Sequence, residues 1–346
     1  MPPGPRPGRF GRRRPTPRIA LAGAGYIAVV HALVAPAAGM KVHAVASANG
    51  TSARHLAGEL DARRCRPEDL PAGADVLVVA TPPVHHLRLA RQGLGAGAAV
   101  LVEKPVATTL GEADQMVAAA AAADPPLRCG ENLLHAPAWV ELMRRRAALG
   151  ALSHLSLRTL QPPPDWGHFT QPLTAGGVLF DLGPHPVALA LAAADEQPTS
   201  VRARLSSARD DGADDDARLE LTFTSGLVAT LHISWTAPEV VWDLQAASDT
   251  GVLRLELLPD VVLEHDGEPV TVARRHEVPD PRLEQLGYVD QLLDLVGDAT
   301  VGQTAEQARL VLEVICAAYA SAGSAEPVSL PFTGDRSATP MQLWRN

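Results

Sequence analysis

A short apolar run that leads directly into closely spaced glycines constrains the fold of this chain more than any other feature. Residues 18–22 have the composition of a buried strand, and Gly23-Ala24-Gly25-Tyr26-Ile27-Ala28 follows at once with the spacing G-x-G-x-x-A. Gly23 allows the tight bend of such a turn, and Gly25 lets the backbone approach a pyrophosphate. The helix that starts at Tyr26 presents its N-terminal N–H groups to the anion. The pattern predicts a dinucleotide-binding turn built by Gly23, Gly25, Tyr26 and Ile27.

Strand and helix patterns go on alternating as far as residue 130. The expected buried strands cover residues 18–22, 41–46, 75–80, 98–103 and 127–130, and the expected helices cover residues 26–37, 87–94 and 112–122. Such alternation builds a parallel sheet with helices on both faces. We therefore expect an α/β fold whose first part, residues 18–130, is a doubly wound Rossmann domain.

Beyond residue 130 the pattern changes to strands in which apolar and polar residues alternate. After a helix at about 137–149, such strands are expected at residues 152–160, 201–205, 218–223, 227–235, 241–246, 251–257 and 261–263, with helices at 284–295 and 305–322. This pattern is typical of a large, mostly antiparallel sheet with one open face. Residues 131–346 are predicted to form an α+β domain for substrate binding, and the open face predicts a homodimer or homotetramer. The acidic run at 210–216 is expected to be a solvated loop.

Charge and composition exclude several classes of protein. Residues 1–17 hold five arginines and no acid, so they are expected to be a disordered basic tail. The chain as a whole carries a net charge of −9, which argues against a nucleic-acid surface on its folded body. No apolar run is long enough for a membrane span, and Cys65, Cys129 and Cys316 fit neither a disulfide framework nor a metal motif. We expect a cytoplasmic enzyme without a metal ion.

The ends of two expected strands bear on the choice of cofactor. Ser47 follows the second strand, where an acidic residue would hold the ribose 2′-hydroxyl of NAD. Because Ser47 does not repel a 2′-phosphate, NAD or NADP can bind, with a slight preference for NADP, although the nearest arginine, Arg54, lies well inside the next helix. The third strand ends in Thr81-Pro82-Pro83, a stiff extended turn that we expect to pass beneath a ribose or nicotinamide. His86 is expected to start the following helix beside the cofactor.

The fourth expected strand ends in Glu103-Lys104-Pro105. The carboxyl ends of parallel strands open onto the ligand crevice, so Lys104 is expected to project where chemistry takes place. Pro105 lacks an N–H group and restricts the backbone of Lys104, which favours a single orientation of the lysine. The alternative is an ordinary surface lysine at a strand end.

A second group of polar residues lies in the region after residue 160. Asp181 and His185 are four residues apart, so on one helix they would share a face and the carboxylate would steer a proton-carrying imidazole. The alternative is a buried histidine satisfied by a backbone carbonyl. The Pro-rich loop 161–174 carries Trp166 and His168, which we expect to contact the substrate.

Taken together, the glycine turn, Thr-Pro-Pro…His, Glu-Lys-Pro and Gly-Gly…Asp-x-Gly-x-His resemble the glucose-fructose oxidoreductase / inositol dehydrogenase / rhizopine-catabolism (Gfo/Idh/MocA) family over roughly residues 18–330. The resemblance implies that Lys104 lies beside the nicotinamide and the reacting carbon. It further implies that His185 donates or accepts the proton, with Asp181 as its neighbour, while Glu103 and the Thr81–Pro83 turn line the cofactor. The family's substrates are commonly sugars, inositols and related polyols or ketones.

Two positions depart from the pattern of the family. An Asp often stands three residues after the histidine, where this chain has Ala188, and an aromatic–Arg pair often stands where it has Glu131-Asn132-Leu133-Leu134-His135. By resemblance both positions border the substrate pocket, so Asn132 is an expected substrate contact and the two departures bear on the choice of substrate.

These residues predict an NAD(P)-dependent oxidoreductase that transfers a hydride between the nicotinamide and a carbinol or ketone carbon of a small polyol. Lys104 or His185 would exchange the proton of the substrate oxygen. Two alternatives stay open: a non-catalytic NAD(P)-binding sensor or partner protein, and a glycosidase that oxidises its substrate only transiently and shows no net reduction of NAD.

Overall fold

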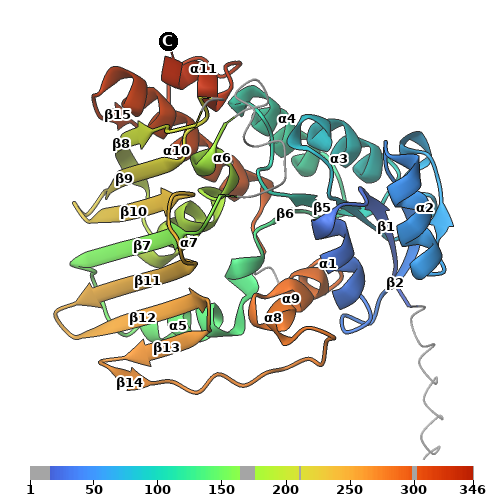
Figure 1. Ribbon diagram of the computed structural model, residues 1–346, viewed down its shortest axis with the longest axis horizontal. Coiled ribbons are helices and arrows are strands. Elements are labelled where there is room, and N and C mark those ends of the chain that lie inside the picture. Colours follow the sequence, from blue (N-terminus) through green and yellow to red (C-terminus); the bar gives the residue numbers. More distant parts are fainter. Residues whose placement is uncertain (1–15, 164–175, 210–211, 298–301, 346) are drawn as a thin grey trace, which may run out of the picture.

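The computed structural model describes residues 16–163, 176–209, 212–297 and 302–345. In this part of the chain six parallel strands form the first sheet in the order β3-β2-β1-β4-β5-β6 (Figure 1). Their bounds are β1 (Arg18–Ala22), β2 (Lys41–Ala46), β3 (Arg63–Arg64), β4 (Val76–Val79), β5 (Ala99–Glu103) and β6 (Leu127–Gly130). The order reverses between β1 and β4, which is where the carboxyl ends of a doubly wound sheet open a ligand crevice. The predicted Rossmann topology is confirmed, whereas β3 was not predicted because it is two exposed arginines long.

Helices and 3₁₀ turns connect these strands: α1 (Tyr26–Val34), α2 (Gly50–Glu59), η1 (Pro67–Asp69), η2 (Pro83–His85), α3 (His86–Gly95) and α4 (Leu110–Ala121). After β6, η3 (Asn132–His135) and α5 (Pro137–Arg146) lead to the second sheet. Side chains cap two of them, since Asn49 accepts backbone N–H groups at the start of α2 and Thr109 does so for α4. Helix α1 ends at Val34, three residues earlier than predicted, because Pro36 cannot donate to its hydrogen-bond ladder.

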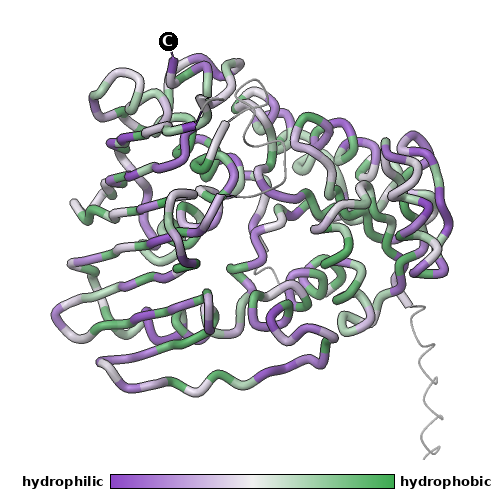
Figure 2. The backbone as a smooth tube through the Cα atoms, in the orientation of Figure 1, coloured by the Kyte–Doolittle hydropathy of each residue, from purple (hydrophilic) through white to green (hydrophobic). Residues whose placement is uncertain are grey.

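The second sheet has nine strands in the order β14-β13-β12-β11-β7-β10-β9-β8-β15. Every neighbouring pair is antiparallel except β7 and β10, so the predicted mostly antiparallel sheet is confirmed. The bounds are β7 (His154–Leu160), β8 (Pro198–Ser206), β9 (Asp216–Phe223), β10 (Val228–Ser234), β11 (Val241–Ser248), β12 (Gly251–Leu258), β13 (Val262–His265), β14 (Glu268–Pro269) and β15 (Val328–Ser329). Along these strands green and purple segments alternate in Figure 2, as expected when one face packs on helices and the other is open.

Helices α5, α7 (Pro184–Ala194) and α10 (Ala305–Ser324) pack on this sheet, and α11 (Pro340–Arg345) packs on α10. A short helix, α6 (Val178–Asp181), precedes α7. The sequence predicted one helix through Asp181 and His185, but the chain breaks at Leu182 and Gly183. Pro184 starts α7 as its first residue, which suits a residue without an N–H group.

Two further helices, α8 (Pro281–Gln285) and α9 (Tyr288–Asp294), belong to the second half of the sequence but pack on α1 of the first sheet (Figure 1). Leu283, Val289 and Leu292 share a buried core with Ile19 and Val45. The single helix predicted at 284–295 is interrupted by Gly287, whose φ is +86° and whose added Cβ would lie 2.3 Å from a backbone oxygen. No helix within the described ranges is long and apolar enough to cross a membrane.

Candidate active site

The glycine turn after β1 has the geometry of an anion-binding site. Gly23 has a φ of +124°, and a Cβ added there would lie 2.2 Å from the carbonyl oxygen of Ala80, so only glycine fits. An added Cβ at Gly25 would meet no atom within 4 Å, which leaves open space in front of α1. Gly25 gives α1 no side-chain cap, and the first turn has no acidic residue. The N–H groups of α1 leave room for a pyrophosphate, and the predicted cofactor contact of this turn stays a prediction.

Thr81 and His86 shape the turn that follows β4. The hydroxyl oxygen of Thr81 is buried and has no hydrogen-bond partner in the described chain, so it can bind a group that enters the crevice. His86 is fully buried; its Nε2–H donates to the Thr81 carbonyl at 2.8 Å, and its Nδ1 lies 3.1 Å from the Pro105 carbonyl. Burial lowers the pKa of His86. The prediction that His86 contacts the cofactor is corrected: its ring is enclosed and joins the Thr81 turn to the turn after Lys104.

Lys104 lies at the carboxyl end of β5 and reaches across to the second half of the chain. Its Nζ donates to the Asp181 carbonyl oxygen at 2.9 Å and to Asp181 Oδ1 at 3.1 Å. The lysine side chain is 19% exposed and that of Asp181 4% exposed, so the ion pair lies largely out of water. Lysine is rare in this sequence: Lys41 is the only other one, and all other positively charged side chains apart from histidine are arginines. Unlike arginine, lysine can give up its proton.

The partner of His185 is not Asp181, which was predicted one helical turn away, but Glu131, which follows β6. Nδ1 of His185 donates to Oε1 of Glu131 at 2.7 Å, and both side chains are buried. The expectation that Asp181 steers His185 is therefore wrong, because the break before Pro184 turns the two residues apart and Asp181 binds Lys104 instead. Glu131 directly follows β6, at the same sheet edge as Lys104, and that placement was the signal that sequence reasoning missed.

Glu103 was predicted to line the cofactor, and the structure places it behind Lys104. Its Oε1 accepts the Nε2–H of buried His31 on α1 at 2.6 Å, and its Oε2 accepts the backbone N–H of Lys104 at 3.2 Å. A Cβ added at Gly130 would lie 2.8 Å from the carboxyl carbon of Glu103, so the neighbouring strand leaves room only for hydrogen there. Glu103 thus ties α1 to the end of β5 and fixes the backbone of Lys104.

The remaining predicted site residues differ in burial and in hydrogen-bond partners. Asn132 is buried, and its amide nitrogen donates to the Leu286 carbonyl at 2.8 Å, so this amide holds the end of α8 instead of a substrate. Ser47 follows β2, where its hydroxyl oxygen accepts the Asn49 N–H at 3.3 Å. Tyr26 is 74% exposed at the start of α1. Trp166 and His168 lie outside the described residues.

A buried acid holds the segment that carries Asp181. Asp214 accepts the N–H groups of Gly177 at 2.9 Å and of Leu179 at 2.8 Å, and the hydroxyl of Tyr319 at 2.6 Å. Burial raises the pKa of Asp214, and burial together with the Asp214 charge raises the pKa of Tyr319 well above its usual value. The expected solvated loop at 210–216 is therefore wrong for Asp214, whose backbone and side chain start α6.

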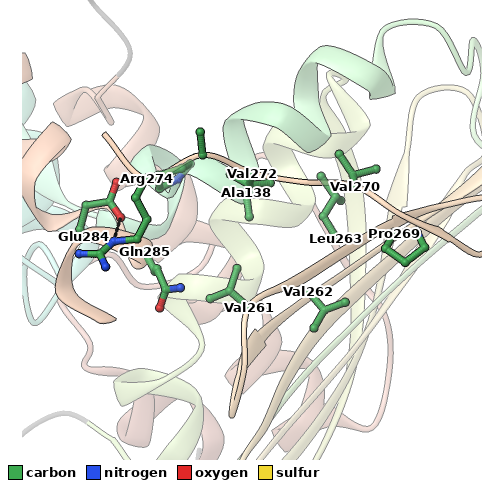
Figure 3. Close-up of a pocket in the computed structure, with 12 residues that line it drawn as sticks. Ala138, Val261, Val262, Leu263, Pro269, Val270, Val272, Arg274, Glu284 and Gln285 are labelled. Atoms are coloured by element: carbon green, nitrogen blue, oxygen red, sulfur yellow. Dashed lines mark ion pairs between the residues drawn. The ribbon is translucent and has the colours of Figure 1, made fainter. Parts of the chain in front are cut away.

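Two other features lie away from this site. A cavity of about 260 Å³ opens between β13, α5 and α8; valines line one end, and Arg274 lies 3.8 Å from Glu284 at the other (Figure 3). None of the residues described above lines it. No cluster of three or more potential metal ligands occurs among the described residues.

An open dinucleotide turn beside two buried acid–base pairs, Lys104–Asp181 and His185–Glu131, is the arrangement of a nicotinamide-dependent oxidoreductase. The sequence comparisons agree. Residues 17–130 match the model of the oxidoreductase family with an NAD-binding Rossmann fold, and residues 140–253 match the GFO/IDH/MocA C-terminal domain. The chain belongs to the Gfo/Idh/MocA family of oxidoreductases and has its NAD-binding domain.

Several named proteins are similar to this chain. A putative UDP-kanosamine synthase oxidoreductase subunit of Amycolatopsis mediterranei is 29% identical over 72% of this chain and 79% of its own length. GenD2 from gentamicin A biosynthesis, solved in complex with NAD, is 27% identical with a TM-score of 0.80, covering 95% of this chain and 99% of the other. The structure of UDP-N-acetylglucosamine 3-dehydrogenase from Acidithiobacillus ferrooxidans is 25% identical with a TM-score of 0.71, covering 86% and 94% of the two chains.

Proposed function

We propose that this protein is an NAD(P)-dependent dehydrogenase or reductase that acts on a CH–OH group of a sugar, inositol or related polyol. The names of two similar proteins, both concerned with UDP-sugars, favour a hexose or aminohexose, free or linked to a nucleotide. The observation that carries the proposal is the meeting of two acid–base pairs at the carboxyl edge of the Rossmann sheet, Lys104–Asp181 and His185–Glu131.

The cofactor fits the residues present: Gly23, Gly25 and the start of α1 would hold its pyrophosphate, and the hydroxyl of Thr81 would bind it further along the crevice. When bound, its nicotinamide supplies the acceptor or donor of the hydride. Among the described residues, Lys104 and His185 are the two acid–base groups that would act on the substrate oxygen.

His185 and Lys104 would divide the work on the substrate oxygen. Because Glu131 accepts the Nδ1–H of His185, the neutral ring keeps Nε2 as an acceptor for the hydroxyl proton. The Nζ of Lys104 would donate to the same oxygen and stabilise the negative charge that develops on it, which is most effective out of water. Asp181, predicted to be catalytic, becomes a positioning residue for Lys104.

Cofactor preference is a finer part of the proposal. The end of β2 offers the hydroxyl of Ser47 and the side chain of Asn49, and no carboxylate that would repel a 2′-phosphate. We therefore keep the slight preference for NADP as a proposal, although GenD2 was solved with NAD. The ratio of kcat/KM for NADPH and NADH decides it.

The assembly proposed from the sequence, a homodimer or homotetramer through the large sheet, has support in the charges on its open face. One row crosses six strands in register: Arg204, Arg218, His232 and Arg158, then Asp243 and Glu256. A second copy turned by a two-fold axis would place its acidic end on the basic end of the first. We further propose a cytoplasmic location, which suits the free Cys65, Cys129 and Cys316.

The test is a substrate panel. The purified protein is given NAD⁺ or NADP⁺ with myo-inositol, D-glucose, UDP-glucose and UDP-N-acetylglucosamine, and formation of reduced cofactor is followed by absorbance. Net reduction with one of them supports the proposal. Cofactor binding without any turnover points to a sensor, and glycoside cleavage without net reduction points to transient oxidation.

A further inference from the structure

The second residue of strand β11 is a tryptophan whose ring packs beside the ring of the proposed proton carrier, His185. Trp242 pairs with Thr159 of β7 in an antiparallel register, and directly opposed residues point to the same face of a sheet. Thr159 is buried on the helix-covered face, so the indole stands on that face as well, at its edge. The ring centroids of Trp242 and His185 are 5.3 Å apart with the planes tilted by 43°.

The indole nitrogen of Trp242 is an unsatisfied donor. Nε1 is buried and has no hydrogen-bond partner in the described parts of the chain, while the side chain as a whole is only partly buried. Buried donors are nearly always paired and an indole nitrogen can only donate, so Nε1 is available to an oxygen that enters beside His185. The neighbour of this tryptophan is His185, whose own remaining nitrogen faces the reacting oxygen in the proposed function.

We infer that Trp242 is a specificity-determining residue that donates its Nε1–H to a second oxygen of the substrate, next to the carbinol that His185 deprotonates. The inference rests on the proposed function and deepens it. Two adjacent oxygens of one sugar ring can meet two side-chain rings whose centres are 5.3 Å apart, one oxygen directed to His185 and the other to the indole N–H of Trp242. The substrate class is thereby narrowed to polyols with a hydroxyl or carbonyl oxygen adjacent to the oxidised carbon; an isolated secondary alcohol is a poor substrate.

This hydrogen bond would discriminate between substrates because the Nε1–H of Trp242 stays unpaired when a substrate lacks the second oxygen. A site built to hydrogen-bond a substrate hydroxyl rejects the analogue without it more strongly than an apolar pocket rejects a missing methylene. Removal of the indole N–H removes this penalty, so the preference for the adjacent oxygen disappears together with the donor.

The test compares W242F with the wild type, using the panel member that the wild type oxidises best and its deoxy derivatives at the carbons beside the reacting one. We expect kcat/KM of W242F to fall roughly tenfold to a hundredfold, mainly through the substrate KM, with the cofactor KM unchanged. In the wild type one deoxy derivative is strongly disfavoured; in W242F the same derivative is disfavoured much less.

Trp235 supplies a matched control, because its indole nitrogen is also buried without a hydrogen-bond partner in the described chain, while its side chain is 1% exposed and fully enclosed. W235F removes the same group and is expected to keep the wild-type kcat/KM and deoxy preference. The inference is overturned if W242F retains the deoxy preference, or if W235F changes it equally. No turnover of any panel member by the wild type overturns the proposed function itself and the inference with it.

Discussion

Glu131 binds the Nδ1–H of His185 at 2.7 Å although 54 positions separate them in the sequence. Gly130, the residue before Glu131, pairs across the sheet with Glu103, the residue before Lys104. The ends of two neighbouring strands therefore each present one charged residue to α6 and α7: Lys104 binds Asp181, and Glu131 binds His185. The site is a pair of cross-links between the two halves of the chain, each joining an acid and a proton carrier.

Replacement of Lys104 by Met should separate binding from chemistry. Met keeps the length of the side chain but cannot donate to the substrate oxygen, so kcat should fall by roughly a hundredfold or more. The dissociation constant of NAD(P)H, measured by titration calorimetry, should stay within about threefold, because the pyrophosphate turn is untouched. K104R should be similarly slow, since the larger, planar guanidinium cannot place a donor where the compact ammonium group of Lys104 does.

The control for this experiment is the other lysine. Lys41 starts β2 with its side chain 64% exposed, and K41M should leave both kcat and cofactor binding unchanged. Wild-type turnover in K104M would discard Lys104 as the group that acts on the substrate oxygen.

Replacement of Glu131 by Gln should lower kcat through His185. The amide no longer requires the Nδ1–H tautomer, so part of the enzyme presents the wrong nitrogen to the substrate, and kcat should fall roughly tenfold to a hundredfold with little change in the substrate KM. Glu141 on α5, paired with Arg144 and Arg145 at the surface, gives the control E141Q, which should keep full activity. Equal rates for E131Q and the wild type would show that His185 needs no partner.

The first sheet could be predicted from the sequence because its strands are local apolar runs separated by helices of ordinary length, and the glycine turn fixes where the ligand lies. The residues at the ends of these strands could be predicted too: Lys104 and Thr81 were expected at the crevice because they come after β5 and β4. What could not be predicted is which side chains meet across the two halves. The contacts of Glu131 and Asp181 depend on the break between α6 and α7 at Gly183 and Pro184. The direction that the chain takes at this break is seen only in the structure.

Buried polar residues were the other failure. Asp214 lies in an acidic run whose composition predicts exposure to solvent. It is buried instead, and Tyr319, 105 positions away, donates a hydrogen bond that stabilises its carboxylate. His86 and Asn132 were expected at the site because they adjoin its motifs, but their hydrogen bonds go to backbone carbonyls. Sequence position places a residue near a site; only the partners of its polar atoms decide whether it faces the ligand.

Stability should fall in mild acid, in part through His86. Burial lowers the pKa of this histidine below its ordinary value of about 6.5, so the unfolded chain takes up a proton before the folded one does. The contribution of neutral, buried His86 to the free energy of unfolding is fully present above about pH 6.5 and is lost as the pH falls below this value. In urea unfolding at several pH values, H86Q should show a shallower acid loss than the wild type. H55Q, at an exposed histidine, should follow the wild type; equal slopes for H86Q and H55Q would contradict the assignment.

Loss of the Tyr319 hydroxyl should destabilise the fold. Y319F leaves the buried Asp214 without one of its donors, and an unsatisfied group of this kind costs about 1–3 kcal/mol. Denaturant unfolding should therefore show a free energy lower by this amount, while Y26F, at a tyrosine that is 74% exposed, should change it by less than about 0.5 kcal/mol. An unchanged free energy of unfolding in Y319F would mean that Asp214 needs only its two backbone donors.

The charge row on the open sheet gives a prediction for assembly. If a second copy covers this face in a two-fold arrangement, the basic end at Arg204 and Arg218 lies against Glu256 of the other copy, and reversing either end brings like charges together. Light scattering on a sizing column should give a dimer or tetramer for the wild type and a smaller species for R204E/R218E and for E256R. The combined variant R204E/R218E/E256R restores opposite charges and should recover the assembly. Its failure to do so, or a wild-type monomer at micromolar concentration, would rule out this face as the interface.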